Sequence, residues 1–115
     1  EDEIINFLYL EALFERYPFK ILHAKNGKEA VTMIEENEAI SLVLMDIKMP
    51  IMNGIEATME IRKKNKNLPI IALTAYVMEE DKEKMFCAEF NDYLAKPLDE
   101  KTLINMVKKH QKESI

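Results

Sequence analysis

The stretch SLVLMDIKMPIMNG, residues 41–54, best indicates the fold, because in it a short apolar run ends on a carboxylate. Residues 42–45 are apolar at every position, which is typical of a strand inside a parallel sheet covered by helices on both faces. Asp46 is the first charged residue after this run. Taken alone, an aspartate here fits a strand end, where Asp favours local hydrogen bonds. Its role therefore depends on which residues the fold brings beside it.

Length and charge exclude several classes of protein. A chain of 115 residues forms one domain with a core of its own, and the single cysteine, Cys87, cannot form an internal disulfide. No apolar run is long enough to span a membrane, and the net charge of −5 argues against a surface that grips nucleic acid. We expect a cytoplasmic chain. Its basic runs, Arg62–Lys64 and Lys108–Lys109, fall near helix ends, where we expect them to be solvated.

Strands and helices are predicted to alternate along the chain. The apolar patterns predict strands at 20–24, 41–45, 68–73 and 92–95, and helices at 3–17, 26–37, 53–65, 78–90 and from 99 onward. Such alternation implies an α/β fold with a parallel sheet and helices on both faces.

Helix caps support three of these predictions. Asn26, Asn53 and Asp99 each stand where an N-cap is expected. The segment after Asn53 is ambiguous, because its apolar residues alternate as they would in a strand. Glu56, three residues after Asn53, completes a capping box, and the charged composition also favours a helix.

Polar side chains follow three of the predicted strands directly. In a parallel sheet the carboxyl ends of the strands share one edge, so Asp46, Thr74 and Lys96 are predicted to converge there. A carboxylate, a hydroxyl and an ammonium suit phosphoryl transfer, with Asp46 as nucleophile. Such a site needs a divalent cation, and Asp2 with Asp46 could bind magnesium if the first helix starts at the same edge. Acidic residues 1–3 also suit the start of a helix without any metal.

Several motifs carry a resemblance to a known family. They are Glu1-Asp2, Met45-Asp46, MPIMNG at 49–54, Leu73-Thr74-Ala75 and YLAKP at 93–97. With this order and spacing, the chain closely resembles the receiver (phosphoacceptor) domain of two-component response regulators over essentially its whole length.

The resemblance implies a role for each matching residue. It implies that Asp46 accepts a phosphoryl group from a phosphohistidine with the help of Mg²⁺. Asp2 would bind the metal directly, Glu1 through water, and Lys48 through its backbone carbonyl. Thr74 would donate its hydroxyl to one phosphoryl oxygen, and Lys96 would pair with another.

The resemblance also implies a readout and partners. Tyr93 matches the family's switch aromatic, although from its position alone it is an ordinary strand residue. The implied partners are a sensor histidine kinase or a histidine phosphotransfer domain. A homodimer through residues 78–112 is a further arrangement that we keep open.

The family's fold is flavodoxin-like and doubly wound, with five strands in the order 2-1-3-4-5. The first, central strand of that order precedes the acidic pair, and this chain begins at that pair. We therefore expect residues 1–115 to be a receiver domain that lacks its first strand. The neighbouring strand would then have an unpaired edge.

Two other functions remain open. A phosphatase of the haloacid dehalogenase type also uses an aspartate nucleophile, but it carries a second acid two residues later, where this chain has Lys48. A pseudo-receiver would bind partners without phosphorylation, which the intact set of Asp46, Thr74 and Lys96 argues against.

The sequence that follows Asp46 resembles that of receivers in hybrid sensor histidine kinases. The domain would then catalyse its own phosphorylation and dephosphorylation as part of a longer signalling protein.

Overall fold

The computed structural model contains four strands and four helices within the residues that it describes. These are residues 12, 15, 20–24, 26–37, 39–47, 52–74, 79–95 and 99–113, of which 20, 23, 24, 79–82, 86 and 111–113 are described by their backbone alone. The predicted helix at 3–17 falls almost entirely outside this set.

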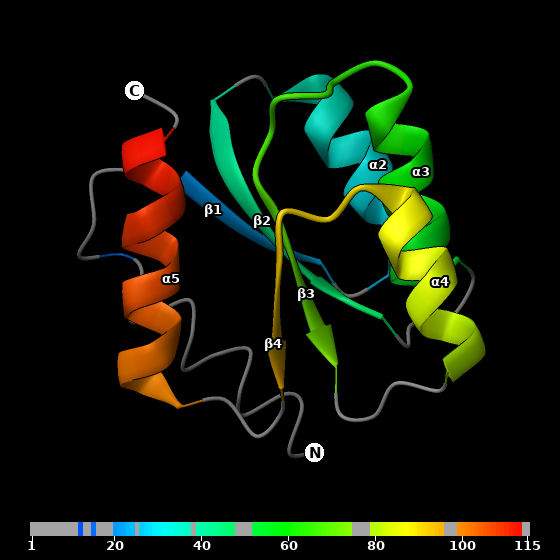
Figure 1. The fold of residues 1–115 in the computed structure, drawn as a ribbon. Coiled ribbons are helices and arrows are strands. Elements are labelled where there is room, and N and C mark those ends of the chain that lie inside the picture. Colours follow the sequence, from blue (N-terminus) through cyan, green and yellow to red (C-terminus); the bar gives the residue numbers. More distant parts are fainter. Residues whose placement is uncertain are drawn as a thin grey trace.

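The elements alternate as predicted (Figure 1). In chain order they are β1 (Lys20–Ala24), α2 (Gly27–Glu36), β2 (Ile40–Asp46), α3 (Gly54–Arg62), β3 (Ile70–Thr74), α4 (Glu79–Ala88), β4 (Asp92–Ala95) and α5 (Glu100–Glu113). All neighbouring strands are parallel, in the order β1-β2-β3-β4. The predicted parallel α/β fold is therefore confirmed.

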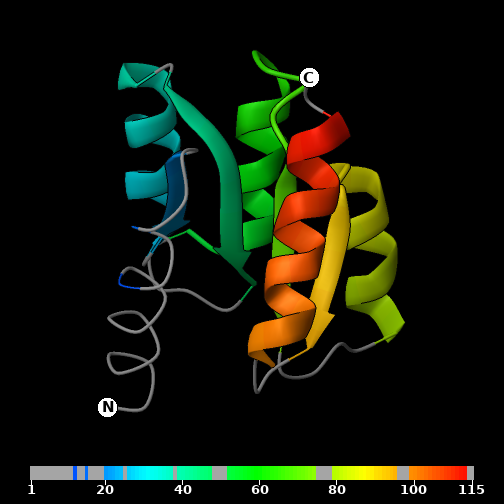
Figure 2. The same cartoon turned by 90° about the vertical axis from the view of Figure 1, so that its left-hand side faces the viewer.

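Helices cover both faces of the sheet, with α2, α3 and α4 on one side and α5 on the other (Figures 1 and 2). The two faces of β2 and β3 are both buried, as the unbroken apolar runs predicted. Leu44 and Ile71 belong to the cluster that includes Leu103 and Val107 of α5. Met45 and Ile70 belong to the cluster on the opposite face, which includes Ala57 of α3.

The edge of β2 is paired, contrary to the expectation from the family's strand order. That order places another strand between β1 and β2, whereas here the two strands are direct neighbours, with Ile21 opposite Leu42 and Ala24 opposite Met45. The expectation of an open edge was wrong because β1 itself supplies the backbone partners of β2. One irregularity of register remains between Lys20 and Ile21.

The predicted caps all form. Asn53 and Glu56 make a complete capping box, with distances of 2.9 Å and 3.1 Å between each backbone nitrogen and the other residue's side-chain oxygen. The side chain of Asn26 accepts from the Glu29 N–H at 2.7 Å, and that of Asp99 accepts from the Thr102 N–H at 3.0 Å. These side chains satisfy backbone donors that the first turn of a helix leaves unpaired.

The ambiguous segment 53–65 is helical, and its burial explains the ambiguity. Ile55, Ala57 and Ile61 are buried, but Met59 is 49% exposed, so the apparent alternation is not the true buried pattern. Thr58 and Arg62 complete the buried side of α3. Because these two residues are polar, an apolar pattern could not reveal them.

Candidate functional site

Two of the predicted site residues end adjacent strands. Asp46 is the last residue of β2 and lies opposite Leu73, while Thr74 is the next residue and the last of β3. The Ile47 N–H donates to the Leu73 carbonyl at 3.1 Å, which holds the two strand ends together. Both site side chains are half-buried. The structure thus places a carboxylate and a hydroxyl at the carboxyl ends of neighbouring strands.

Gly54, the first residue of α3, packs against the backbone of Asp46. Its N–H donates to the Ile47 carbonyl at 3.0 Å. A β-carbon on Gly54 would overlap the carbonyl oxygen of Asp46, so only glycine fits this close approach. The backbones of Asp46, Ile47 and Gly54 are therefore held close together.

Most of the predicted metal ligands lie outside the described residues. Glu1, Asp2 and Lys48 are in this group, whereas Asp46 lies within the described ranges. Among the side chains that the structure describes, no three His, Cys, Asp or Glu residues gather as a metal centre would require. The donor set of carboxylates with a carbonyl remains of the type that magnesium prefers.

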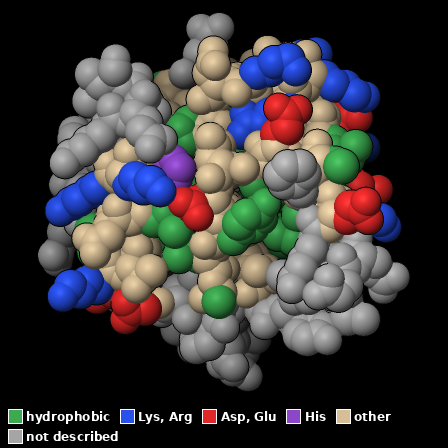
Figure 3. All heavy atoms as spheres, viewed as in Figure 1, with side chains coloured by type: hydrophobic (Ala, Val, Ile, Leu, Met, Phe, Trp, Pro, Cys, Tyr) green, Lys and Arg blue, Asp and Glu red, His purple; other side chains and the backbone are tan. Residues whose placement is uncertain are grey.

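Lys96 also lies outside the described residues, but its neighbours on β4 are described. Ala95, the residue before it, lies opposite Thr74. Tyr93, the predicted switch aromatic, is 43% exposed, and its ring centroid is 6.1 Å from that of Phe90. Figure 3 shows hydrophobic side chains at the surface between α5 and α4, around β4.

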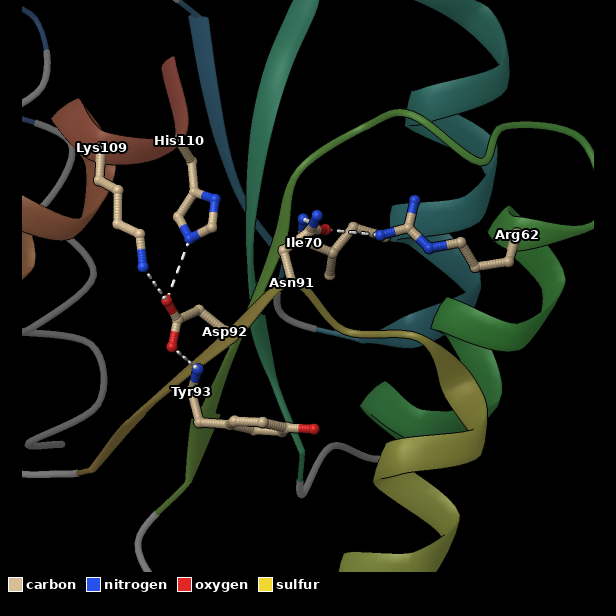
Figure 4. Close-up of polar contacts among 7 residues, drawn as sticks. All are labelled: Arg62, Ile70, Asn91, Asp92, Tyr93, Lys109 and His110. Atoms are coloured by element: carbon tan, nitrogen blue, oxygen red, sulfur yellow. Dashed lines mark hydrogen bonds and ion pairs between the residues drawn. The ribbon is translucent and has the colours of Figure 1, made fainter. Parts of the chain in front are cut away.

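A charged cluster joins β4 to α5, and the sequence did not reveal it (Figure 4). His110 of α5 is buried, and its Nε2 lies 3.1 Å from Oδ2 of Asp92. Lys109 Nζ lies 3.6 Å from the same oxygen. Burial raises the pKa of Asp92, but the hydrogen bonds from His110 and the Tyr93 N–H, with the charge of Lys109, outweigh it and hold the pKa below its usual value.

Arg62 corrects the prediction that its basic run is solvated. Lys63 and Lys64 are exposed as predicted, but Arg62 is only 5% exposed. Its guanidinium donates to the carbonyls of Leu68 at 2.8 Å, Glu89 at 2.9 Å and Asn65 at 3.1 Å. It also donates to Oδ1 of Asn91 at 2.7 Å, the bond drawn in Figure 4. Burial lowers the pKa of Arg62, and the charge of Glu89 opposes that shift.

A helical signal for Arg62 was present in the sequence. Arg62 stands four residues after Thr58 and seven after Ile55, so all three share one side of α3. The same network explains why β3 begins at Ile70, two residues later than predicted. The Leu68 carbonyl is bonded to Arg62, and the Ile70 N–H donates to Asn91 Oδ1 at 2.7 Å.

Comparisons with known proteins agree with this architecture. The family model of the response regulator receiver domain matches residues 1–108. Hybrid signal transduction histidine kinase I of Dictyostelium discoideum is 38% identical over 115 residues, which cover 93% of this chain and 7% of that protein. The chain therefore spans a small part of that relative.

Solved structures of receiver domains are similar in fold and sequence. The receiver domain of sensor histidine kinase PA1611 from Pseudomonas aeruginosa, solved with magnesium in its active-site cleft, has a TM-score of 0.78 and 33% identity, with 91% of this chain and 87% of that chain covered. The receiver domain of Ssk1 from Saccharomyces cerevisiae, solved with the phosphotransfer protein Ypd1, has a TM-score of 0.78 and 32% identity, with 94% and 82% covered.

No helix within the described residues is long and apolar enough to cross a membrane. The family match, the relatives and the parallel sheet with its carboxylate at the end of β2 lead to one identification. The chain belongs to the response regulator receiver domain family of two-component signal transduction.

Proposed function

We propose that Asp46 accepts a phosphoryl group from a phosphohistidine and that residues 1–115 act as one receiver domain. The observation that carries this proposal is the placement of Asp46 and Thr74 at the ends of adjacent parallel strands, one residue out of register. Ligands of open α/β sheets bind at this edge. Half-burial suits both side chains, because a reactive carboxylate needs access to a donor while its position stays fixed.

In the proposed reaction, one carboxylate oxygen of Asp46 attacks phosphorus as the P–N bond of the donor breaks. The electron pair of that bond returns to the donor imidazole, and Asp46 becomes an acyl phosphate. The Thr74 hydroxyl would donate to one phosphoryl oxygen, and the Lys96 ammonium would pair with another.

Magnesium would be held by Asp46 and Asp2, by Glu1 through water, and by the carbonyl of Lys48. When bound, it neutralises charge on the phosphoryl oxygens. The magnesium in the related receiver of Pseudomonas aeruginosa supports this assignment. Asp46 supplies a carboxylate at the correct edge of the sheet.

Tyr93 is our candidate for the residue through which phosphorylation changes the partner-binding surface. Its exposed ring lies beside Phe90 and projects from β4 (Figure 4). A phosphoryl group adds about −1.5 to −2 units of charge near pH 7. Movement of Thr74 toward that charge would open space for the Tyr93 ring and change the surface that a partner meets.

The proposed partner is a histidine kinase or a histidine phosphotransfer domain. The similarity to a receiver solved with Ypd1 and the match within a hybrid kinase support it. A homodimer through residues 78–112 is an outcome to be measured, since that range includes the exposed Tyr93. The net charge of −5 gives no support for nucleic acid as a partner.

Acetyl phosphate with Mg²⁺ tests this function. Intact-mass spectrometry should show one added phosphoryl group on the wild-type chain, dependent on Mg²⁺ and labile to base. Thr74→Ser, which keeps the hydroxyl, should be modified faster than Thr74→Val. Folded wild-type protein that gains no phosphoryl group would refute the proposal, and multiple turnovers of a small phosphate ester would favour a phosphatase instead.

A further inference from the structure

Gly27, the first residue of α2, contacts Met52, which lies two residues before Gly54. The Gly27 N–H donates to the Met52 carbonyl at 2.8 Å. Gly27 is buried, and a β-carbon on it would overlap that same carbonyl oxygen. The β-carbon would also lie 2.9 Å from Met52 Cγ and 3.0 Å from Ala57 Cβ. The obstructing atom is backbone, so a larger residue at position 27 would displace the segment that contains Met52.

Met52 is linked through the next two residues to the backbone of Asp46, the proposed phosphoryl acceptor. The next residue, Asn53, is held by its capping box with Glu56. Gly54 follows, with its N–H bonded to the Ile47 carbonyl at 3.0 Å and no space for a β-carbon against Asp46. A displacement at Met52 is therefore transmitted within two residues to the backbone of Asp46.

We propose that Gly27 is a positioning residue for phosphoryl transfer to Asp46. Because Gly27 has no side chain, the Met52 carbonyl can approach its N–H to hydrogen-bond distance. This position of Met52 allows Gly54, two residues later, to pack against the backbone of Asp46. The effect on catalysis can be large, because a misplacement of about 1 Å can slow a reaction roughly a hundredfold. This inference rests on the proposed function of Asp46.

A purely structural role for Gly27 is the competing explanation, and a neighbouring residue separates the two. Asn26 caps the same helix through the Glu29 N–H at 2.7 Å, and its side-chain amide donates to the Glu29 carboxylate at 3.4 Å, so its side chain bonds within the first turn. Asn26→Ala should weaken the start of α2 without pushing on Met52. Gly27→Ala pushes on Met52 and leaves the cap in place.

The experiment compares wild type, Gly27→Ala and Asn26→Ala with acetyl phosphate across a range of Mg²⁺ concentrations. Gly27→Ala should be phosphorylated about tenfold or more slowly per folded molecule, while Asn26→Ala stays within about twofold of wild type. Magnetic resonance gives a readout without turnover, since the Gly54 amide signal should shift in Gly27→Ala and not in Asn26→Ala. Equal rates in Gly27→Ala and wild type, or equal losses in both variants, would overturn the inference.

If Gly27→Ala does not fold, amide hydrogen exchange of the wild type decides. The Gly27 N–H should exchange more slowly when Mg²⁺ and beryllium fluoride, a phosphoryl analogue, are added, and the capped Glu29 N–H should not change. Unchanged exchange at Gly27 would refute the inference. Failure of wild type to be phosphorylated is a separate outcome, which removes the proposed function and this inference together.

Discussion

At the amino ends of β3 and β4, the buried guanidinium of Arg62 donates four hydrogen bonds to the surrounding loops. At the carboxyl ends of β2 and β3, Asp46 and Thr74 are half-buried and are the last residues of their strands. The first arrangement is closed, because its donors are satisfied within the protein. The second is accessible, as a phosphoryl donor requires. One sheet thus separates the residues that hold the fold from those that would carry the chemistry.

Substitution of Arg62 should give the largest effect, a loss of stability without a loss of phosphorylation. Arg62→Met removes the guanidinium donor from three backbone carbonyls and from Asn91 Oδ1, which then keeps only the Ile70 N–H, so we expect a loss of about 3 kcal/mol in the free energy of unfolding. The phosphorylation rate per folded molecule should stay within about twofold of wild type, because Arg62 lies at the other end of the sheet. Urea unfolding and acetyl phosphate kinetics measure the two quantities.

Lys63→Met is the matched control for that variant. Lys63 is exposed and lies just after α3, where its Nζ pairs with Glu60 at 2.9 Å, so its removal should change stability by less than about 0.5 kcal/mol. Equal losses in the two variants would contradict the role given to the buried guanidinium.

Thr58 gives a smaller effect of opposite sign. Its hydroxyl oxygen is buried and, among the described residues, has no hydrogen-bond partner. Thr58→Val removes that unsatisfied group and keeps the branched shape, so we expect a gain of about 1 kcal/mol in thermal or urea unfolding. A loss of stability would indicate that the hydroxyl has a partner after all. Thr102→Val is the contrast, because the Thr102 hydroxyl donates to Asp99 at 2.7 Å and its removal should destabilise.

The smallest expected effect is the pH dependence due to Asp92. The pKa of Asp92 is lower in the folded state than its usual value, so its contribution to stability is present above about pH 4 and is lost as the pH falls through the folded-state pKa. The difference in unfolding free energy between wild type and Asp92→Asn should therefore shrink as the pH falls below about 4. A difference that grows toward low pH would contradict the sign of this shift.

The sequence predicted most of the fold because it depends on local patterns. Unbroken apolar runs identified β2 and β3, and the caps at Asn26, Asn53 and Asp99 located three helix starts. The shared edge of a parallel sheet then correctly predicted that Asp46 and Thr74 lie at neighbouring strand ends.

What the sequence did not reveal depends on contacts between distant segments. The direct pairing of β1 with β2 is a choice among strand orders that no local pattern encodes. Arg62 was misjudged because its acceptors, such as Glu89 and Asn91, belong to the turn between α4 and β4. The magnesium ligands expected at Glu1, Asp2 and Lys48 remain predictions. The ion pair expected between Lys96 and a phosphoryl oxygen also remains a prediction.

The central claim is that Asp46 is the acceptor, and chemical trapping tests it most directly. After reaction with acetyl phosphate and Mg²⁺, borohydride reduces an acyl phosphate to an alcohol, which marks the modified residue in a peptide map. We predict that the wild-type chain carries this mark at Asp46 alone and that Asp46→Asn carries none. A mark on another carboxylate of wild type, or undiminished phosphorylation of folded Asp46→Asn, would contradict the claim.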